Sequence, residues 1–317
     1  MFRPTTIAIC LSLVAPSAFA DGQTSTEENM AAFERLFGVT KGKRRNHTKG
    51  FCIVGEFLPK DPAIRKYSKS PIFAGKSAVN GRVSHKGGKA NPPDNKPANY
   101  GLAFEITTPE NDSHIINMNT EHFFPVSTTE KFIELLRAKA KGKEATKAFA
   151  KSSPELKAYK AYHSALDKSL RPYEGATYNS INTFYLVDDA GKKTAVRWSF
   201  IPTGQHELVL PPSESFFLEN MQANLKKGAV TWDMVVSIAE DGDDILNPAI
   251  KWSDSNTKIV AASLKVTSAV RESDGVCDEM NFDPTLLSEG FEPSEDPMLQ
   301  ARSDIYALGV GRRTAEK

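Results

Sequence analysis

Residues 281–313 read NFDPTLLSEGFEPSEDPMLQARSDIYALGVGRR, and their C-terminal half has the signals of a helix. Asp296 and Pro297 open this helix, since proline is favoured at the first helical position. Arg302 and Tyr306 then lie four residues apart and project from the same face. A tyrosine loses its proton near pH ~10, so a phenolate at neutral pH needs a nearby cation, and Arg302 can be that cation. The stretch predicts a helix that carries an arginine-supported tyrosine.

Three stretches far upstream hold side chains of the kinds that move protons or bind anions. Residues 44–50 read RRNHTKG and are followed by GEF at 55–57, residues 82–84 read RVS, and residues 117–124 read NMNTEHFF. Together with the C-terminal stretch, they resemble the distal and proximal signatures of the haem catalases. The resemblance runs in pieces from Arg44 to Arg313 and is most specific at its C-terminal end.

By this resemblance, the C-terminal helix supplies the proximal side of a haem pocket. Tyrosinate is the proximal ligand type of catalase haem, so Tyr306 would bind the iron, with Arg302 in support. Arg313, seven residues later, matches the arginine that meets a haem propionate. No CxxCH motif for covalent attachment occurs, so we expect a b-type haem held without a covalent bond.

The upstream stretches would supply the distal side of the same pocket. His47 matches the family's acid/base residue, and Arg44, three residues earlier, matches a propionate ligand. Arg82 matches another propionate ligand. Ser84 would accept a hydrogen bond from Nδ1 of His47, which fixes the tautomer and leaves Nε2 free to face peroxide.

The stretch at 117–124 departs from the family pattern. The family has two adjacent asparagines before the threonine, and the first of them is catalytic; that position here is Met118. The distal amide is therefore missing, displaced, or supplied by Asn119, and Asn119 is the candidate. Phe132 lies near the family's haem-stacking phenylalanine, with one extra residue between it and the preceding phenylalanine pair.

Strand and helix signals are interleaved along the chain. Short apolar or alternating runs at 50–58, 78–84 and 100–107 are separated by Gly, Pro and Asn, which is typical of strands and turns. Residues 182–203 read as a hairpin, and a capping box at Ser127 to Glu130 starts a helix. The pattern favours an α+β fold, an antiparallel β-barrel with surrounding helices. The resemblance implies a catalase-like barrel in one haem-binding domain over 21–317, without the N-terminal arm and C-terminal helical domain of typical catalases.

Residues 1–20 have the features of a signal peptide. Arg3 precedes an apolar stretch from Ile7 to Val14, and small residues stand at Ala18 and Ala20, as the A-x-A rule requires. We therefore expect an exported, periplasmic protein. No later apolar run approaches the ~20 residues of a membrane helix, so no membrane span is expected.

Charge and cysteine content narrow the function classes. Without Arg3, 39 basic and 39 acidic side chains remain, a balance that indicates neither a nucleic-acid nor a membrane partner. The lysine-rich stretch 139–151 is interleaved with Ala and Glu, which fits a solvated helix surface better than a polyanion site. Cys52 and Cys277 form either one disulfide or two separate buried thiols.

The resemblance implies an enzyme. His47 would carry a proton from one peroxide oxygen to the other, leaving a ferryl intermediate. If Met118 replaces the amide that orients a second peroxide, dismutation suffers and peroxidation survives. We expect a haem peroxidase that reduces hydrogen peroxide or organic hydroperoxides with a small reducing donor, has weak catalase activity, and is a monomer or homodimer. The alternatives are a non-catalytic haem carrier or sensor and a hydroperoxide-isomerising enzyme.

Overall fold

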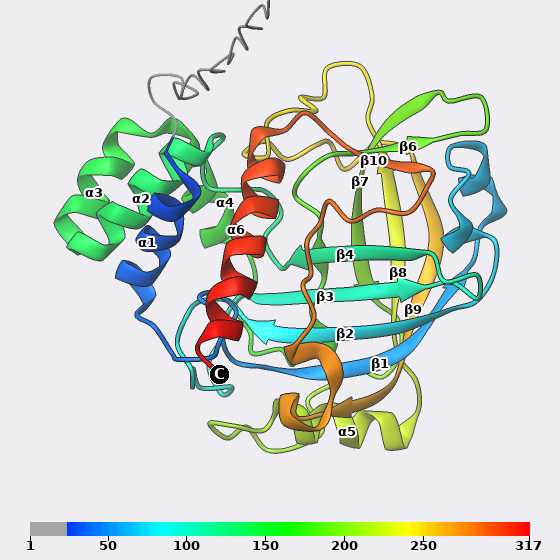
Figure 1. Ribbon diagram of the computed structural model, residues 1–317, viewed down its shortest axis with the longest axis horizontal. Helices are drawn as coiled ribbons and strands as arrows, with labels where there is room; N and C mark the ends of the chain where they lie inside the picture. The colour runs from blue at the N-terminus through cyan, green and yellow to red at the C-terminus, as the bar shows by residue number, and fades with distance from the viewer. Residues whose placement is uncertain (1–23) are drawn as a thin grey trace, which may run out of the picture.

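A closed antiparallel β-barrel forms the body of the protein (Figure 1). The computed structural model describes residues 24–317, so the predicted signal peptide, residues 1–20, lies outside the described residues. Neighbouring strands pair in sequence around the barrel, and β9 returns to pair with β1, which closes it. This confirms the predicted α+β barrel. Its eight strands are β1 (Gly50–Pro59), β2 (Ser77–His85), β3 (Tyr100–Thr107), β4 (Ser113–Asn119), β5 (Tyr178–Asn179), β7 (Lys193–Pro202), β8 (Val230–Ile238) and β9 (Lys258–Val270).

Two further short strands, six α-helices and five short 3₁₀ helices are the other regular elements of the described residues. β6 (Phe184–Val187) pairs with β7, and β10 (Phe291–Pro293) pairs with β6. The helices are α1 (Thr26–Phe37), α2 (Thr129–Lys141), α3 (Lys143–Ser152), α4 (Pro154–Ala165), α5 (Phe217–Lys227) and α6 (Pro297–Ala315). Helices α1 to α4 form a group on one side, and α6 lies between that group and strands β2 to β4 (Figure 1).

The N-terminus of α2 differs from the prediction. Thr128, rather than Ser127, is the N-cap residue, and its side chain accepts a hydrogen bond from the Lys131 amide. The Ser127 hydroxyl donates instead to Glu155 of α4, at 2.6 Å. Ser127 therefore makes a hydrogen bond to another helix instead of the N-cap hydrogen bond that the local sequence predicted.

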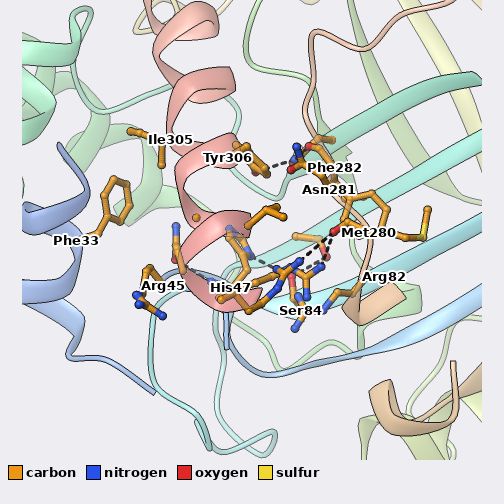
Figure 2. A pocket seen from close by; sticks show the side chains of 18 of the residues that line it. Phe33, Arg45, His47, Arg82, Ser84, Met280, Asn281, Phe282, Ile305 and Tyr306 are labelled. Atoms are coloured by element: carbon orange, nitrogen blue, oxygen red, sulfur yellow. Dashed lines mark hydrogen bonds between the residues drawn. The ribbon is translucent and has the colours of Figure 1, made fainter. Parts of the chain in front are cut away.

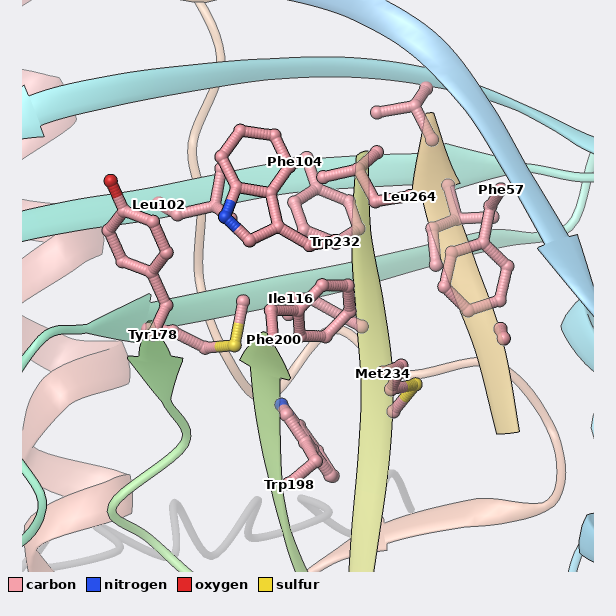
Figure 3. Packing of buried hydrophobic residues seen from close by; sticks show 14 of the residues in the cluster. Phe57, Leu102, Phe104, Ile116, Tyr178, Trp198, Phe200, Trp232, Met234 and Leu264 are labelled. Carbon is pink, nitrogen blue, oxygen red and sulfur yellow. The ribbon is translucent and has the colours of Figure 1, made fainter. Parts of the chain in front are cut away.

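Large apolar side chains fill the inside of the barrel (Figure 3). Trp232, Phe104 and Phe200 are fully buried there. Because successive residues of a strand point to opposite faces, the residues between the core positions point outward. On β2, β3 and β4 this outer face meets α6, and it carries the functional residues described below.

A disulfide joins Cys52 of β1 to Cys277, which lies 225 residues later in the chain. The structure thereby decides between the two alternatives that the sequence left open. Cys277 belongs to a short 3₁₀ turn, Val276–Asp278, on the segment that leads from β9 to α6. No helix within residues 24–317 has the length and apolar character needed to cross a membrane.

Candidate active site

A cavity of about 870 Å³, here called the main cavity, lies between the outer face of β2 to β4 and helices α1 and α6 (Figure 2). A second cavity of about 890 Å³, the adjoining cavity, shares part of its wall. His47 and Tyr306 line both cavities, although 259 residues separate them in the chain.

His47 lies on the turn before β1 in a left-handed conformation, with φ of 56°. Its Nδ1 is 3.0 Å from Oγ of Ser84, and that hydroxyl is 3.5 Å from the Gly101 carbonyl oxygen. If the hydroxyl donates to the carbonyl, it must accept from Nδ1–H, which leaves Nε2 as an unprotonated base. A Cβ on Gly101 would come within 2.7 Å of the imidazole. Glycine at this position therefore lets the ring approach strand β3.

The His47 imidazole is neutral at neutral pH. Burial, with a smaller contribution from the charges of Lys86 and Arg82, lowers the pKa of His47 to about 3. A neutral ring can take up a proton from a bound acid such as a peroxide. The environment therefore keeps the ring uncharged and available as a proton acceptor at neutral pH.

A cluster of arginines stands at one end of the main cavity. Arg44 donates from Nη2 to the carbonyl oxygens of Cys277 and Met280, at 2.9 and 3.0 Å. Burial and the neighbouring charges of Arg82 and Arg313 lower the pKa of Arg44 to about 9.

Acidic partners offset only part of this charge. Glu272 accepts from Arg82 at 2.5 Å and from Lys43 at 3.0 Å, and Asp278 lies 3.4 Å from Arg44. Asp278 also pairs with Lys317, at 2.8 Å. With Arg313, five cations thus face two carboxylates, and the cluster keeps a net positive charge. The carboxylates of a bound cofactor would offset this charge, so these residues fit the propionates of a haem.

Tyr306 reaches the cavity wall from α6 (Figure 2). Its hydroxyl oxygen accepts a 2.7 Å hydrogen bond from Nδ2 of Asn117, which also donates to the Phe282 carbonyl oxygen at 2.7 Å. A donor at this place stabilises a phenolate. Sequence reasoning did not assign this role to Asn117, although strand alternation puts it on the same face as Asn119.

Arg302 has a different partner from the one that its spacing suggested. Its Nη1 donates to Oδ1 of Asn182 at 2.5 Å, and Asn182 donates to Asp296 at 2.6 Å. Arg302 and Tyr306 both line the adjoining cavity. The guanidinium therefore lies near the phenol, but the direct hydrogen bond to the phenol comes from Asn117.

Strand register places the distal amide candidates. Asn119 stands opposite Gly101, which stands opposite Ser84, so all three share the outer face. Met118 points the other way, is 3% exposed, and packs in the barrel core. Oδ1 of Asn119 accepts from the Glu121 amide at 2.8 Å, which leaves its NH₂ group free to donate.

Phe132 of α2 belongs to an aromatic wall of the adjoining cavity. Its ring is edge-on to Phe33 at 5.8 Å between centroids and 4.8 Å from Phe124. The structure thus places all nine predicted site residues on the walls of the two cavities. Six line the main cavity, namely Arg44, His47, Arg82, Ser84, Tyr306 and Arg313, and the other three, Asn119, Phe132 and Arg302, line the adjoining cavity.

Comparison with known proteins agrees with this geometry. A family model described as Catalase matches residues 22–314. A catalase-related peroxidase of Synechococcus elongatus is 32% identical over 314 residues, which cover 95% of this chain and 92% of that protein. A catalase-related peroxidase of Mycolicibacterium paratuberculosis is 26% identical over 304 residues, which cover 92% of this chain and 96% of that protein. The chain therefore belongs to the catalase family.

Proposed function

We propose that the protein is a haem-dependent peroxidase that reduces hydrogen peroxide or organic hydroperoxides and has weak catalase activity. One observation carries the proposal: a neutral histidine with a free Nε2 and a hydrogen-bonded tyrosine line the same cavity, and an arginine cluster stands at one end of it. Both curated relatives are named catalase-related peroxidases, which supports the same conclusion.

Different side chains would bind different parts of the haem. Tyr306 would bind the iron through its phenolate oxygen, with Asn117 donating to that oxygen. Arg44, Arg82 and Arg313 would bind the propionates through charge-assisted hydrogen bonds. The haem, when bound, would supply the redox chemistry that no amino-acid side chain offers.

His47 would move the proton. Its Nε2 takes a proton from the first peroxide oxygen and returns it to the second, so that the second oxygen leaves as water rather than as hydroxide. Ser84 keeps Nδ1 protonated and the ring in place. The NH₂ group of Asn119, which shares the face with Ser84, can donate to the peroxide.

The distal amide also explains why catalase activity would be weak. Dismutation needs a second hydrogen peroxide that is oriented by histidine and amide together. Met118 holds the position of the family's catalytic asparagine, and its side chain is buried in the barrel core. Asn119 stands one residue later on the strand, so its NH₂ group would donate from a different position than the family's asparagine. Reduction by an organic donor makes no such demand on the amide.

Export to the periplasm belongs to the same proposal. The pattern of residues 1–20 supports it. The disulfide between Cys52 and Cys277 supports it as well, because disulfides persist mainly in oxidising compartments.

Steady-state kinetics of the haem-loaded protein test the function. We expect oxidation of a chromogenic donor by hydrogen peroxide, with oxygen evolution at only a small fraction of that rate. His47→Ala should lower peroxidase kcat/KM by about 10²- to 10⁴-fold. Absence of donor oxidation would favour a haem carrier, and rapid oxygen evolution would contradict the weak catalase activity.

A further inference from the structure

A third cavity, of about 600 Å³, lies among helices α1 to α4. We call it the lysine-rimmed cavity. Three lysines line it, Lys86, Lys139 and Lys160, and Glu121 is its only carboxylate among the described residues. The rest of its wall is largely apolar and aromatic, with Phe33, Phe37, Phe132, Leu135, Leu136 and Tyr159.

The inner wall suits a flat apolar group. The Phe33 ring lies 5.8 Å from that of Phe132 and 6.2 Å from that of Phe37, at tilted or edge-on angles. Leu135 and Leu136 are 0% and 3% exposed behind them. Aromatic rings pack against such edges and faces in preference to water.

The side chains that line the cavity carry a net positive charge. Lys86 forms an ion pair with Glu121, whose side chain is 1% exposed and also accepts from the Tyr159 hydroxyl. This pair is therefore neutral. Lys139 and Lys160 are exposed at the rim, and neither has a carboxylate within ion-pair distance among residues 24–317. The rim thus offers two cations to an incoming anion.

The lysine-rimmed cavity reaches toward the proposed site of peroxide reduction. It shares Asn46, Lys86 and Phe132 with the adjoining cavity, which His47 lines. The charge of Lys86 also contributes to the lowered pKa of His47. A ring held against Phe132 would therefore lie beside the proposed haem site, with its polar substituent at the rim.

We propose that the lysine-rimmed cavity binds the reducing donor, and that this donor is an aromatic carboxylate with an oxidisable hydroxyl group. The carboxylate meets Lys139 and Lys160, and the ring lies among the phenylalanines. The inference rests on the proposed peroxidase function and adds the chemical class of its second substrate.

The chemistry balances with peroxide as the oxidant. Each hydrogen peroxide takes up two electrons and two protons and yields two waters. Two phenolic donors supply them, since each loses one electron and one proton as its O–H bond breaks and becomes a phenoxyl radical. No further reductant is needed.

Three donors that share a phenol ring test the charge preference on the haem-loaded protein. They are 4-hydroxyphenylacetate, neutral tyrosol and cationic tyramine. We expect kcat/KM to fall in that order. Lys139→Met combined with Lys160→Met should lower kcat/KM for the carboxylate by about tenfold, about threefold for each lysine. The same variant should leave tyrosol within about twofold. Lys141→Met combined with Lys157→Met, on the same two helices but away from the cavity, should change none of the three.

Binding is measured separately with phenylacetate, which cannot be oxidised in this way. Calorimetry should give a Kd that the Lys139 and Lys160 substitutions weaken by the same factor, and added salt should weaken it too. Equal kcat/KM values for the three donors, an equal loss for all of them in the lysine variant, or no phenylacetate binding would overturn the inference. If the haem-loaded protein oxidises neither the phenols nor the chromogenic donor, the peroxidase function fails, and phenylacetate binding still decides whether the site exists. If it oxidises the chromogenic donor but none of the phenols, the inference fails and the peroxidase function stands.

Discussion

Reduction of the disulfide should loosen the wall of the main cavity. Cys277 is followed within five residues by Met280 and Phe282, which line that cavity. Arg44 donates to the carbonyl oxygens of Cys277 and Met280. The disulfide with Cys52 fixes this segment to β1. Its loss should therefore affect both the stability of the fold and the retention of haem.

The magnitude follows from the length of chain that the disulfide closes. The bond joins residues 225 apart, and the loop-entropy relation gives about 5 kcal/mol of stabilisation for such a loop. The structure describes residues 24–317, for which the unfolding entropy is about 0.6 kcal/mol per kelvin. Cys52→Ser combined with Cys277→Ser should then lower Tm by about 8 °C.

Thermal unfolding with and without a reductant makes the test. The native protein should lose the same Tm increment when it is reduced, and the double variant should not respond to the reductant. Haem transfer to an acceptor protein, followed in the same samples, should become faster in the reduced protein. An unchanged Tm in a sample whose thiol titration shows two free cysteines would refute the reasoning.

Three further outcomes are expected. Ser84→Ala removes the acceptor that keeps Nδ1 of His47 protonated, so kcat/KM for peroxide should fall by about tenfold. Ser84→Thr keeps a hydroxyl and should restore kcat/KM. An unchanged kcat/KM in the alanine variant would argue that Ser84 does not control the His47 tautomer. Arg313→Met removes a cation from the cluster at the main cavity and should speed haem loss by about 10- to 100-fold. The control Arg312→Met, in which the lost side chain pairs with Glu27 and Glu34, should leave the rate of haem loss unchanged. Equal rates for the two variants would count against propionate binding by Arg313. Burial lowers the pKa of His47 from 6.5 to about 3. Below pH 6.5 the unfolded chain therefore binds a proton that the folded protein does not bind. The stability that depends on neutral His47 is complete above pH 6.5 and is lost as the pH falls toward 3. His47→Gln should therefore flatten the fall of Tm between about pH 6.5 and 4, and parallel curves for the two proteins would contradict the assigned pKa.

The barrel was predictable because its strands carry a local signal. Alternation and turn residues at 50–58, 78–84 and 100–107 correspond to β1, β2 and β3. The helix at Pro297 was predictable for the same reason, since Asp296 and Pro297 mark its start. These features depend on near neighbours in the chain.

The rest of the site depends on contacts between distant segments. The hydrogen bond from Asn117 to Tyr306 spans 189 residues, and the one from Arg302 to Asn182 spans 120. These hydrogen-bond partners come from other segments of the chain. The spacing of Arg302 and Tyr306 along one helix therefore could not show which residue each of them would bind. The disulfide was left open for the same reason, and the lysine-rimmed cavity exists only because four helices come together.

The spectrum of the haem-loaded protein tests the central claim most directly. We expect high-spin ferric haem with the absorption bands of a tyrosinate ligand, and loss of those bands in Tyr306→Phe. Tyr185→Phe, which removes a hydroxyl that donates to the exposed Glu295 on the β6 side of the barrel, serves as the matched control and should keep the native spectrum. A Tyr306→Phe protein that binds haem with an unchanged spectrum would contradict the assignment of Tyr306 as the iron ligand.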